Sequence, residues 1–216
     1  MRVLLLALVP ALGLWLFLEL ADEVVEGEIE PIDRALVLMM RDPEDPSDPL
    51  GPRWFEEAMR DITALGSLPV LAIATGVVAG FLLLERSVRA LALLLASTLG
   101  GLLLSSVFKA AFDRPRPDFV PNLTYVLTAS FPSGHAAMSA VVYPTLAALI
   151  ARLAVERRLK IYCIVAALFV TCLVGISRVY AGVHYPSDVV AGWVLGLGWA
   201  TLVWLVAHAL ERRGRV

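Results

Sequence analysis

The chain has 216 residues, 59% of them hydrophobic, and its mean hydropathy is +0.78. A typical soluble domain is roughly 45–50% apolar, so the composition excludes an ordinary soluble globular protein. The formal net charge is only −2 and no nucleic-acid partner is expected, while two cysteines in one apolar run exclude a disulfide framework.

The apolar residues are concentrated in long runs rather than spread at amphipathic spacing. A helix needs about 20 apolar residues to cross the hydrocarbon core of a bilayer, and several runs approach that length. The sequence therefore predicts an all-α, six-transmembrane-helix bundle, formed as a single integral-membrane domain over residues 1–216. The predicted spans cover residues 3–20, 68–84, 90–108, 136–151, 161–176 and 189–209.

The first run, residues 3–20, has the length of either a span or a signal peptide. The residues that follow it, Leu20-Ala21-Asp22, lack a clear small-x-small cleavage site. We therefore favour a retained span over a cleaved leader.

One long polar segment, residues 22–66, separates the first two spans and is predicted to be extracytoplasmic. Residues 32–40 are too short and too charged for a span, so they indicate an interfacial helix. After a proline-rich turn, residues 54–65 carry apolar side chains at helical spacing, which indicates a second surface helix. The segment is thus a short helical extramembrane insertion, and its only assigned role is to shape the entrance.

Basic residues are divided unevenly between the two sides of the predicted bundle. When the loops are counted alternately from the N-terminus, one side receives ten of the 18 Lys and Arg residues and few acids. The positive-inside rule makes this side cytoplasmic. The opposite, extracytoplasmic side then receives three polar clusters that are far apart in the sequence, at residues 109–117, 131–135 and 177–188.

Three cations in these clusters, Lys109, Arg116 and Arg178, lie at the edge of the apolar zone. Charges there are costly unless they have a partner or a role. Three cations with few acids among them suit an oxyanion with three equatorial oxygens. No cluster of carboxylates indicates a divalent metal, so we expect no metal ion or other cofactor.

The stretch Phe131-Pro132-Ser133-Gly134-His135 joins a polar loop to a long apolar run. The first N–H groups of a helix have no intrahelical partner, and the helix dipole favours negative charge beside them. Ser133 can cap this helix, and Gly134 lets a ligand approach the backbone. The stretch therefore predicts an anion-binding helix start.

Two histidines, His135 and His184, are predicted to reach this same face. Asp188 lies four residues after His184, close enough to accept a hydrogen bond from its second ring nitrogen, as in a Ser-His-Asp triad. Pro186 is expected at the first position of the last helix, with Asp188 in its first turn. A nucleophile, an acid and a set of cations together favour phosphoryl transfer.

Three motifs carry a family resemblance: Lys109-x6-Arg116-Pro117, Pro132-Ser133-Gly134-His135 and Ser177-Arg178-x5-His184-x3-Asp188. In order and spacing they resemble the signatures of the type 2 phosphatidic acid phosphatase superfamily. That superfamily includes lipid phosphate phosphatases, bacterial phosphatidylglycerophosphate and undecaprenyl pyrophosphate phosphatases, glucose-6-phosphatase and vanadium haloperoxidases. The family spacing selects Arg116 for phosphate binding, although the adjacent Arg114 could share the contact.

The resemblance implies a metal-independent mechanism through a phosphohistidine. His184 would attack phosphorus, Asp188 would orient His184, and His135 would protonate the leaving oxygen. The other implied roles are contacts to the phosphoryl group, made by Lys109, Arg116, Ser133, Gly134 and Arg178.

We therefore expect an integral-membrane hydrolase that acts on a lipid phosphate or pyrophosphate held in the bilayer. The candidate substrates are undecaprenyl pyrophosphate, phosphatidylglycerophosphate and phosphatidic acid, with a slight preference for a polyprenyl pyrophosphate or broad specificity. The compact size resembles the bacterial members, which implies the inner (cytoplasmic) membrane with the active site on the periplasmic side. No obligate protein partner is expected.

Three alternatives remain open. A phosphotransferase would pass the phosphoryl group of the same phosphohistidine to a sugar or lipid A acceptor instead of water. A non-enzymatic lipid transporter or binding protein would have no need of His184. A vanadium haloperoxidase would hold vanadate in the same cradle, but those enzymes are soluble, and the long apolar runs argue against this class.

Overall fold

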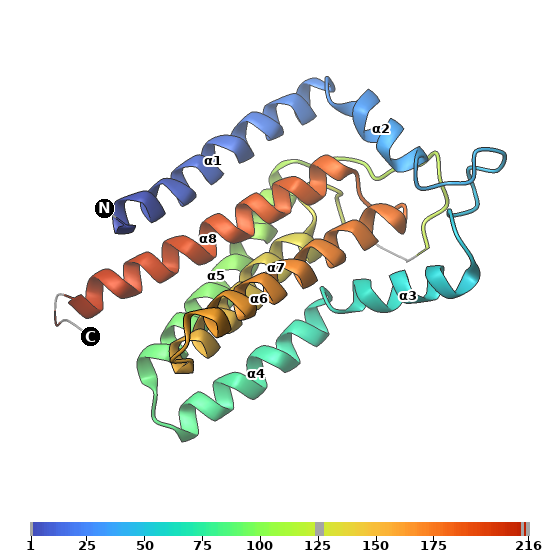
Figure 1. Cartoon of the computed structure of the whole chain (residues 1–216). Coiled ribbons are helices and arrows are strands. Elements are labelled where there is room, and N and C mark those ends of the chain that lie inside the picture. The colour runs from blue at the N-terminus through green and yellow to red at the C-terminus, as the bar shows by residue number, and fades with distance from the viewer. Residues whose placement is uncertain (1, 124–127, 213, 215–216) are drawn as a thin grey trace.

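The computed structural model describes residues 2–123, 128–212 and 214, with side chains from residue 8 onward in these ranges. This part of the chain is all-helical, apart from one isolated bridge between Arg41 and Pro49 (Figure 1). The helices are α1 (Arg2–Glu26), α2 (Glu30–Leu38), α3 (Arg53–Ala64), α4 (Leu68–Leu84), α5 (Val88–Ala111), α6 (Gly134–Leu153), α7 (Arg157–Tyr180) and α8 (Pro186–Arg212). The prediction of an all-α fold is confirmed.

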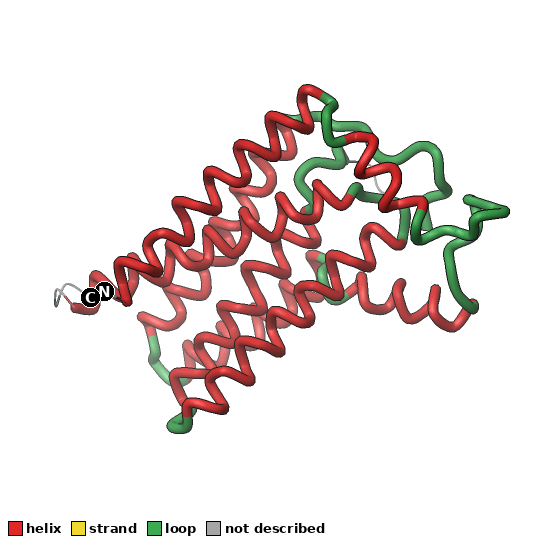
Figure 2. The backbone as a smooth tube through the Cα atoms, turned by 45° about the horizontal axis from the view of Figure 1, so that its top comes forward, coloured by secondary structure: helices red, strands yellow, loops and turns green. Residues whose placement is uncertain are grey.

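The long helices run alternately in opposite directions and form a bundle around α6, which packs against α5, α7 and α8. Helix α1 packs on α8, and α4 packs on α5 at the other side (Figure 1). Because the helices alternate, the start of α6, the end of α7 and the start of α8 all lie at one end. Most of the connecting loops lie at this end too (Figure 2), so the topology brings distant polar segments together.

Four helices, α5 to α8, are long and apolar enough to cross a membrane. Helices α3 and α4 meet at a bend of 49° and would make a fifth span if they are counted as one broken segment. The described residues thus support an integral-membrane fold with four or five spans, while the count of six, which adds α1, remains a prediction. Exposed apolar side chains such as Ile73 (67% exposed) and Leu84 (86%) give the bundle an outer surface suited to lipid.

The helices extend beyond most of the predicted apolar runs. The α4 helix has the predicted bounds, but α5 continues past the predicted end to include Lys109, and α7 continues to include Arg178. Helix α1 likewise continues to Glu26, six residues past its predicted end. A charged residue marks the edge of the apolar zone, whereas the helix itself continues wherever the backbone hydrogen bonds can still form.

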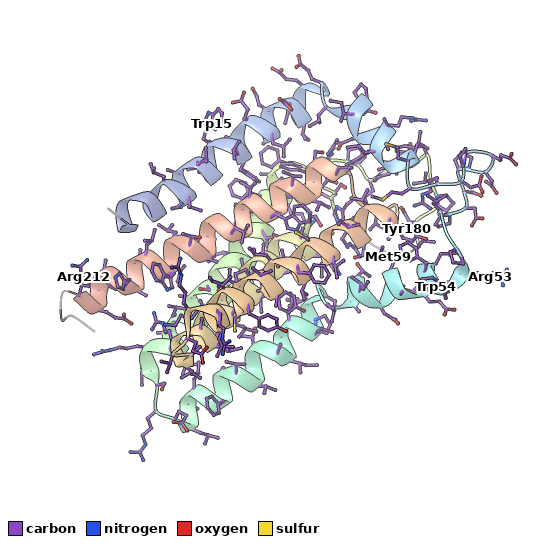
Figure 3. The ribbon with its side chains drawn as sticks, in the orientation of Figure 1. Trp15, Arg53, Trp54, Met59, Tyr180 and Arg212 are labelled. Atoms are coloured by element: carbon purple, nitrogen blue, oxygen red, sulfur yellow. The ribbon has the colours of Figure 1, made fainter. Side chains whose placement is uncertain are left out.

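Helices α2 and α3 occupy the segment between α1 and α4, close to the predicted positions of two short helices. Helix α3 lies along the end of α7, where the Phe55 and Tyr180 rings meet edge to face with centroids 5.4 Å apart. In Figure 3, Trp54 and Met59 lie on α3 and Tyr180 lies at the end of α7. The α2–α3 segment therefore covers the end of the bundle that carries the motifs.

Helix α8 approaches α6 closely at two glycines. A Cβ atom on Gly192 would lie 2.7 Å from the Ser133 carbonyl oxygen, and one on Gly196 would overlap the Ala137 carbonyl oxygen. The absence of a side chain at Gly192 thus lets α8 lie directly against the Ser133–Gly134 motif.

An apolar cavity of about 520 Å³ lies between α6, α7 and α8, lined by residues such as Leu168, Leu197 and Trp204. Arg152 and Lys160, which also line it, belong to the opposite ends of α6 and α7 from those that carry the motifs. This cavity is therefore separate from the polar site described below.

Candidate active site

The three motif segments converge at one end of the bundle. Lys109 lies in the last turn of α5, Ser133 precedes the first residue of α6, and His184 lies in the turn between α7 and α8. The backbone links two of them directly, since the Ser133 N–H donates to the Asp188 carbonyl oxygen at 2.9 Å. Lys109 lies against the helix start, with its Cε atom 3.7 Å from where a Cβ on Gly134 would stand.

His184 is held between an arginine and a carboxylate. Its Nε2 atom lies 3.2 Å from Arg116 Nη1, and its Nδ1 atom lies 3.3 Å from Asp188 Oδ2. A guanidinium N–H can only donate, so Nε2 is the acceptor and the ring proton is on Nδ1, towards Asp188. The side chain of His184 therefore presents a lone pair on Nε2, in the tautomer that a nucleophile requires.

Burial keeps His184 neutral. Its side chain is 2% exposed, and this burial lowers the pKa of the imidazole from 6.5 to about 3. Asp188 acts in the opposite direction, but Arg178 and Arg116 add to the lowering. Near neutral pH the Nε2 lone pair is therefore not lost to a proton.

Asp188 is fully buried and accepts several hydrogen bonds. Its Oδ2 atom accepts from the Ser130 hydroxyl at 2.5 Å and from the Tyr185 N–H at 2.9 Å, in addition to facing His184. Helix α8 starts at Pro186, as predicted, so Asp188 is the third residue and reaches back to the N–H that precedes the helix. The i, i+4 pair of His184 and Asp188 is thus fixed by the geometry of a helix start.

Arg116 and Lys109 bind the carbonyl groups of the loop that leads into α6. Arg116 Nε donates to the Thr128 oxygen at 2.9 Å, and Lys109 Nζ donates to the Ala129 oxygen at 2.6 Å. Arg116 also donates to the carbonyl oxygen of Val183, next to His184. Arg116 thus lies at the Nε2 atom of His184, and Lys109 lies near Arg116 because both cations donate to the Ala129 oxygen.

Arg178 is the third cation and it has a buried donor without a partner. Its side chain is 2% exposed, and Nη1 donates to the Thr63 hydroxyl at 3.0 Å. Among the described residues, Arg178 Nε is one of three buried side-chain nitrogen atoms that lack a partner. Leaving such a donor unpaired costs about 1–3 kcal/mol, so this atom is suited to an arriving anion.

The start of α6 supplies the backbone part of the site. Ser133 caps the helix, since its hydroxyl accepts from the Ala136 N–H at 3.5 Å. Next to it His135, the second residue of α6, is only partly buried. Gly66, at the bend between α3 and α4, packs against His135, because a Cβ there would lie 3.3 Å from the His135 carbonyl oxygen.

Arg114 lies on the carboxylate side of His184 instead of the Nε2 side. Its Nη1 atom donates to Asp188 Oδ1 at 2.7 Å, and its Nη2 atom donates to Asp33 Oδ2 at 2.8 Å. Both terminal nitrogens are thus engaged with carboxylates in this structure. The predicted contact between Arg114 and phosphate remains a prediction, and this geometry gives it no support.

Three side chains in and around the site were not identified from the sequence: Asp33, Thr63 and Ser130. Asp33 is 1% exposed and lies one turn before the buried Val37. A carboxylate on the apolar face of a helix is the sequence feature that could have identified it. No comparable feature of the sequence distinguishes Thr63 or Ser130. Within the described residues no group of three or more His, Cys, Asp or Glu side chains could hold a metal ion.

Comparisons with known proteins point to the same family as the three motifs. The family model of the PAP2 superfamily matches residues 90–212. Phosphatidylglycerophosphatase B of Bacillus subtilis is 34% identical over 190 residues, which cover 84% of this chain and 86% of that protein. An undecaprenyl-diphosphatase of Sulfolobus acidocaldarius is 35% identical over 125 residues, which cover 55% of this chain and 56% of that protein.

Two solved structures are also similar. The crystal structure of a transmembrane PAP2-type phosphatidylglycerolphosphate phosphatase from Bacillus subtilis gives a TM-score of 0.79 at 32% identity, covering 94% of this chain and 98% of that chain. Aquifex aeolicus LpxE gives a TM-score of 0.59 at 24% identity, covering 81% and 93% respectively, a likeness of fold alone. The family match over more than half of the chain and the Bacillus subtilis relative show that this chain belongs to the PAP2 superfamily, the type 2 phosphatidic acid phosphatases that its three motifs resemble.

Proposed function

We propose that the protein is an integral-membrane hydrolase that removes phosphate from a lipid phosphate or pyrophosphate through a phosphohistidine at His184. The observation that carries the proposal is the setting of the His184 ring, with Nδ1 facing Asp188 and Nε2 facing Arg116. A phosphoryl group bound by Arg116 would place phosphorus next to the Nε2 lone pair. The family membership supports the same reaction, since its relatives include named phosphatases.

The reaction would proceed in two steps. First, His184 Nε2 forms a bond to phosphorus while the bond from phosphorus to the lipid oxygen breaks, and His135 gives that oxygen a proton. Second, a water molecule passes a proton to His135 and attacks phosphorus, and the P–N bond breaks to release phosphate and neutral His184. Asp188 stabilises the positive charge that develops on the ring between these steps.

The phosphoryl oxygens would be held by charge and by free donors. No metal ion is proposed, so Lys109, Arg116 and Arg178 would neutralise the negative charge of the phosphoryl group. The unpaired Nε of Arg178 would donate to one of its oxygens. The first N–H groups of α6, at Gly134 and His135, would bind another.

The substrate is proposed to be a lipid with its phosphate at the membrane surface. Phosphatidylglycerophosphate comes first among the candidates because the relative named for it matches 84% of this chain. Undecaprenyl pyrophosphate follows, since another relative is named an undecaprenyl-diphosphatase, and phosphatidic acid completes the set. We further propose six spans, α1 and α4 to α8, in a bacterial inner membrane, with the site facing the periplasm.

The direct test is phosphate release from these three lipids in detergent micelles by the purified protein. We expect His184→Ala to lower the rate by at least about 10³-fold, because no nucleophile remains. His208→Ala is the matched control, since His208 stacks on Trp204 near the other end of α8 and should leave the rate unchanged. Hydrolysis retained by His184→Ala would remove the proposed nucleophile, and transfer to an added sugar or lipid acceptor without phosphate release would favour a phosphotransferase.

Orientation is tested separately by thiol labelling in cells. The background is a chain in which the two free cysteines, Cys163 and Cys172, are replaced by serine. Asn122→Cys, in the loop at the motif end, should react with an impermeant reagent in intact cells, whereas Glu85→Cys, in the turn at the opposite end, should react only after permeabilisation. The reverse pattern would place the active site on the cytoplasmic side.

A further inference from the structure

A buried carboxylate outside the three motifs lies next to the proposed catalytic residues. Asp33, in the short helix α2, is only 1% exposed and shares the buried face of that helix with Val37. A buried carboxylate is costly unless it is paired and hydrogen-bonded. The partners of Asp33 therefore show what this residue does in the fold.

The first partner of Asp33 is the start of α8. Asp33 Oδ1 accepts the Ser187 N–H at 2.9 Å, and Oδ2 accepts the Ser187 hydroxyl. Ser187 is the second residue of α8, where an N–H has no intrahelical partner and the helix dipole favours an anion. Asp33 thus caps α8 from a helix more than 150 residues earlier in the chain.

The second partner of Asp33 is Arg114, which links it to Asp188. Arg114 Nη2 donates to Asp33 at 2.8 Å while Nη1 donates to Asp188 at 2.7 Å, so one guanidinium joins two carboxylates. The Tyr185 ring covers this guanidinium, with its centroid 4.1 Å from the Arg114 Cζ atom. Burial opposes the charge on Arg114, but Asp188 and Asp33 together raise its pKa above the usual value.

The two carboxylates share one positive charge. Paired with Asp188 alone, Arg114 would cancel much of the negative charge that faces His184. Asp33 reduces this cancellation, because it accepts a hydrogen bond from Nη2 of the guanidinium and adds a second negative charge. Asp188 then keeps the charge and the orientation that it needs to hold Nδ1–H of His184 and to stabilise the ring when phosphorus bonds to Nε2.

We propose that Asp33 is a positioning residue for the reaction, acting through Arg114 and the start of α8 to hold Asp188 against His184. The proposal rests on the proposed function, in which His184 is the nucleophile. It assigns the otherwise unexplained α2 segment a part in catalysis, although Asp33 does not itself face the phosphate site.

The test is the kinetics of Asp33→Asn on a lipid that the wild-type protein hydrolyses. Asparagine keeps the size of the side chain but removes the charge, and its NH₂ group would face another donor, on either Arg114 or Ser187. We expect kcat to fall about 10-fold, the scale of coupling within one hydrogen-bonded network, with KM unchanged. Glu28→Gln, an exposed carboxylate beside α2, is the matched control and should keep the wild-type kcat.

A double-mutant cycle separates positioning from a purely structural role. If Asp33 acts through Arg114, Arg114→Gln alone and the double variant should lose about the same factor as Asp33→Asn, whereas independent effects would multiply to about 100-fold. Multiplied losses, or an Asp33→Asn kcat within twofold of the Glu28→Gln value, would overturn the proposal.

A second variant, Arg114→Lys, and the activities of the wild type and His184→Ala complete the test. If Asp33→Asn does not give folded protein, Arg114→Lys replaces it, because one ammonium group cannot bridge both carboxylates. A kcat of wild-type size in that variant would refute the bridge, and a loss of about 10-fold at unchanged KM would support it. Failure of the proposed function is a different outcome, namely no phosphate release by the wild type or full activity in His184→Ala.

Discussion

Replacing Gly192 by alanine tests how closely the segments of the proposed active site must approach one another. Gly192 lies in the second turn of α8, against the backbone of the segment that leads into α6. A Cβ atom at this position would lie 2.7 Å from the Ser133 carbonyl oxygen and 3.0 Å from the Ala137 nitrogen. These neighbours are main-chain atoms, so the clash cannot be relieved by turning a side chain.

The size of the effect follows from these distances. Ordinary contact starts at 3.4 Å, and 3.4 − 2.7 = 0.7 Å, so α8 and the start of α6 must separate by up to about 0.7 Å. Overpacking of this kind costs about 1–3 kcal/mol of folding stability. Because Asp188 is carried by α8 and His135 by α6, the same shift moves two of the proposed catalytic groups apart. A displacement approaching 1 Å in an active site lowers the rate about 10- to 100-fold.

The assay compares lipid phosphate hydrolysis and thermal unfolding in detergent for Gly192→Ala and the wild type. Gly80→Ala is the matched control, since no heavy atom lies within 4 Å of a Cβ there, and alanine should leave activity unchanged while favouring helix α4 by up to about 1 kcal/mol. If Gly192→Ala kept the wild-type kcat and melting temperature, the close approach of α8 to α6 would not matter for the site.

Three further predictions concern single side chains. Burial lowers the pKa of His184 to about 3, so between pH 6.5 and pH 3 the unfolded chain binds a proton at this residue that the folded chain does not. The free energy of unfolding should therefore fall by about 2 kcal/mol from pH 7 to pH 5. An equal fall in His184→Gln would contradict the assignment of this loss to His184. Asp188→Asn should lower kcat about 10³- to 10⁴-fold because the Nδ1 tautomer is no longer enforced, and a loss below 10-fold would argue against that role. Arg178→Lys keeps the charge but removes the buried Nε–H, so inhibition by orthovanadate should weaken about 10-fold or more; an unchanged inhibition constant would show that Nε does not meet the anion.

Local sequence spacing predicted part of the site well. His184 and Asp188 are four residues apart across a helix start, and Pro186 marks that start, so their contact at 3.3 Å follows from short-range geometry. The arrival of Lys109 and Arg178 at the same end of the bundle follows from the alternating direction of the apolar helices. The number and order of the apolar runs are therefore enough to predict at which end of the bundle these residues lie.

The parts that the sequence did not predict depend on contacts between distant segments. In the sequence around it, Asp33 is only one charged residue in a short amphipathic helix. Its partner Arg114 lies 81 positions away in the chain. Thr63 meets Arg178 only because α3 folds back along α7, with 115 positions between the partners. Neither spacing nor periodicity encodes such pairs, because α2 and α3 are placed by the packing of the whole bundle.

The central claim is that His184 forms a covalent bond to phosphorus, and trapping that intermediate tests it most directly. Purified protein would be mixed with a ³²P-labelled lipid phosphate, quenched within the first turnover in alkali, in which phosphohistidine survives, and digested for peptide mapping. We predict an acid-labile label on the peptide that contains His184, which is absent from His184→Ala. A label on another residue, or turnover by active enzyme with the ³²P never bound to His184, would contradict the account.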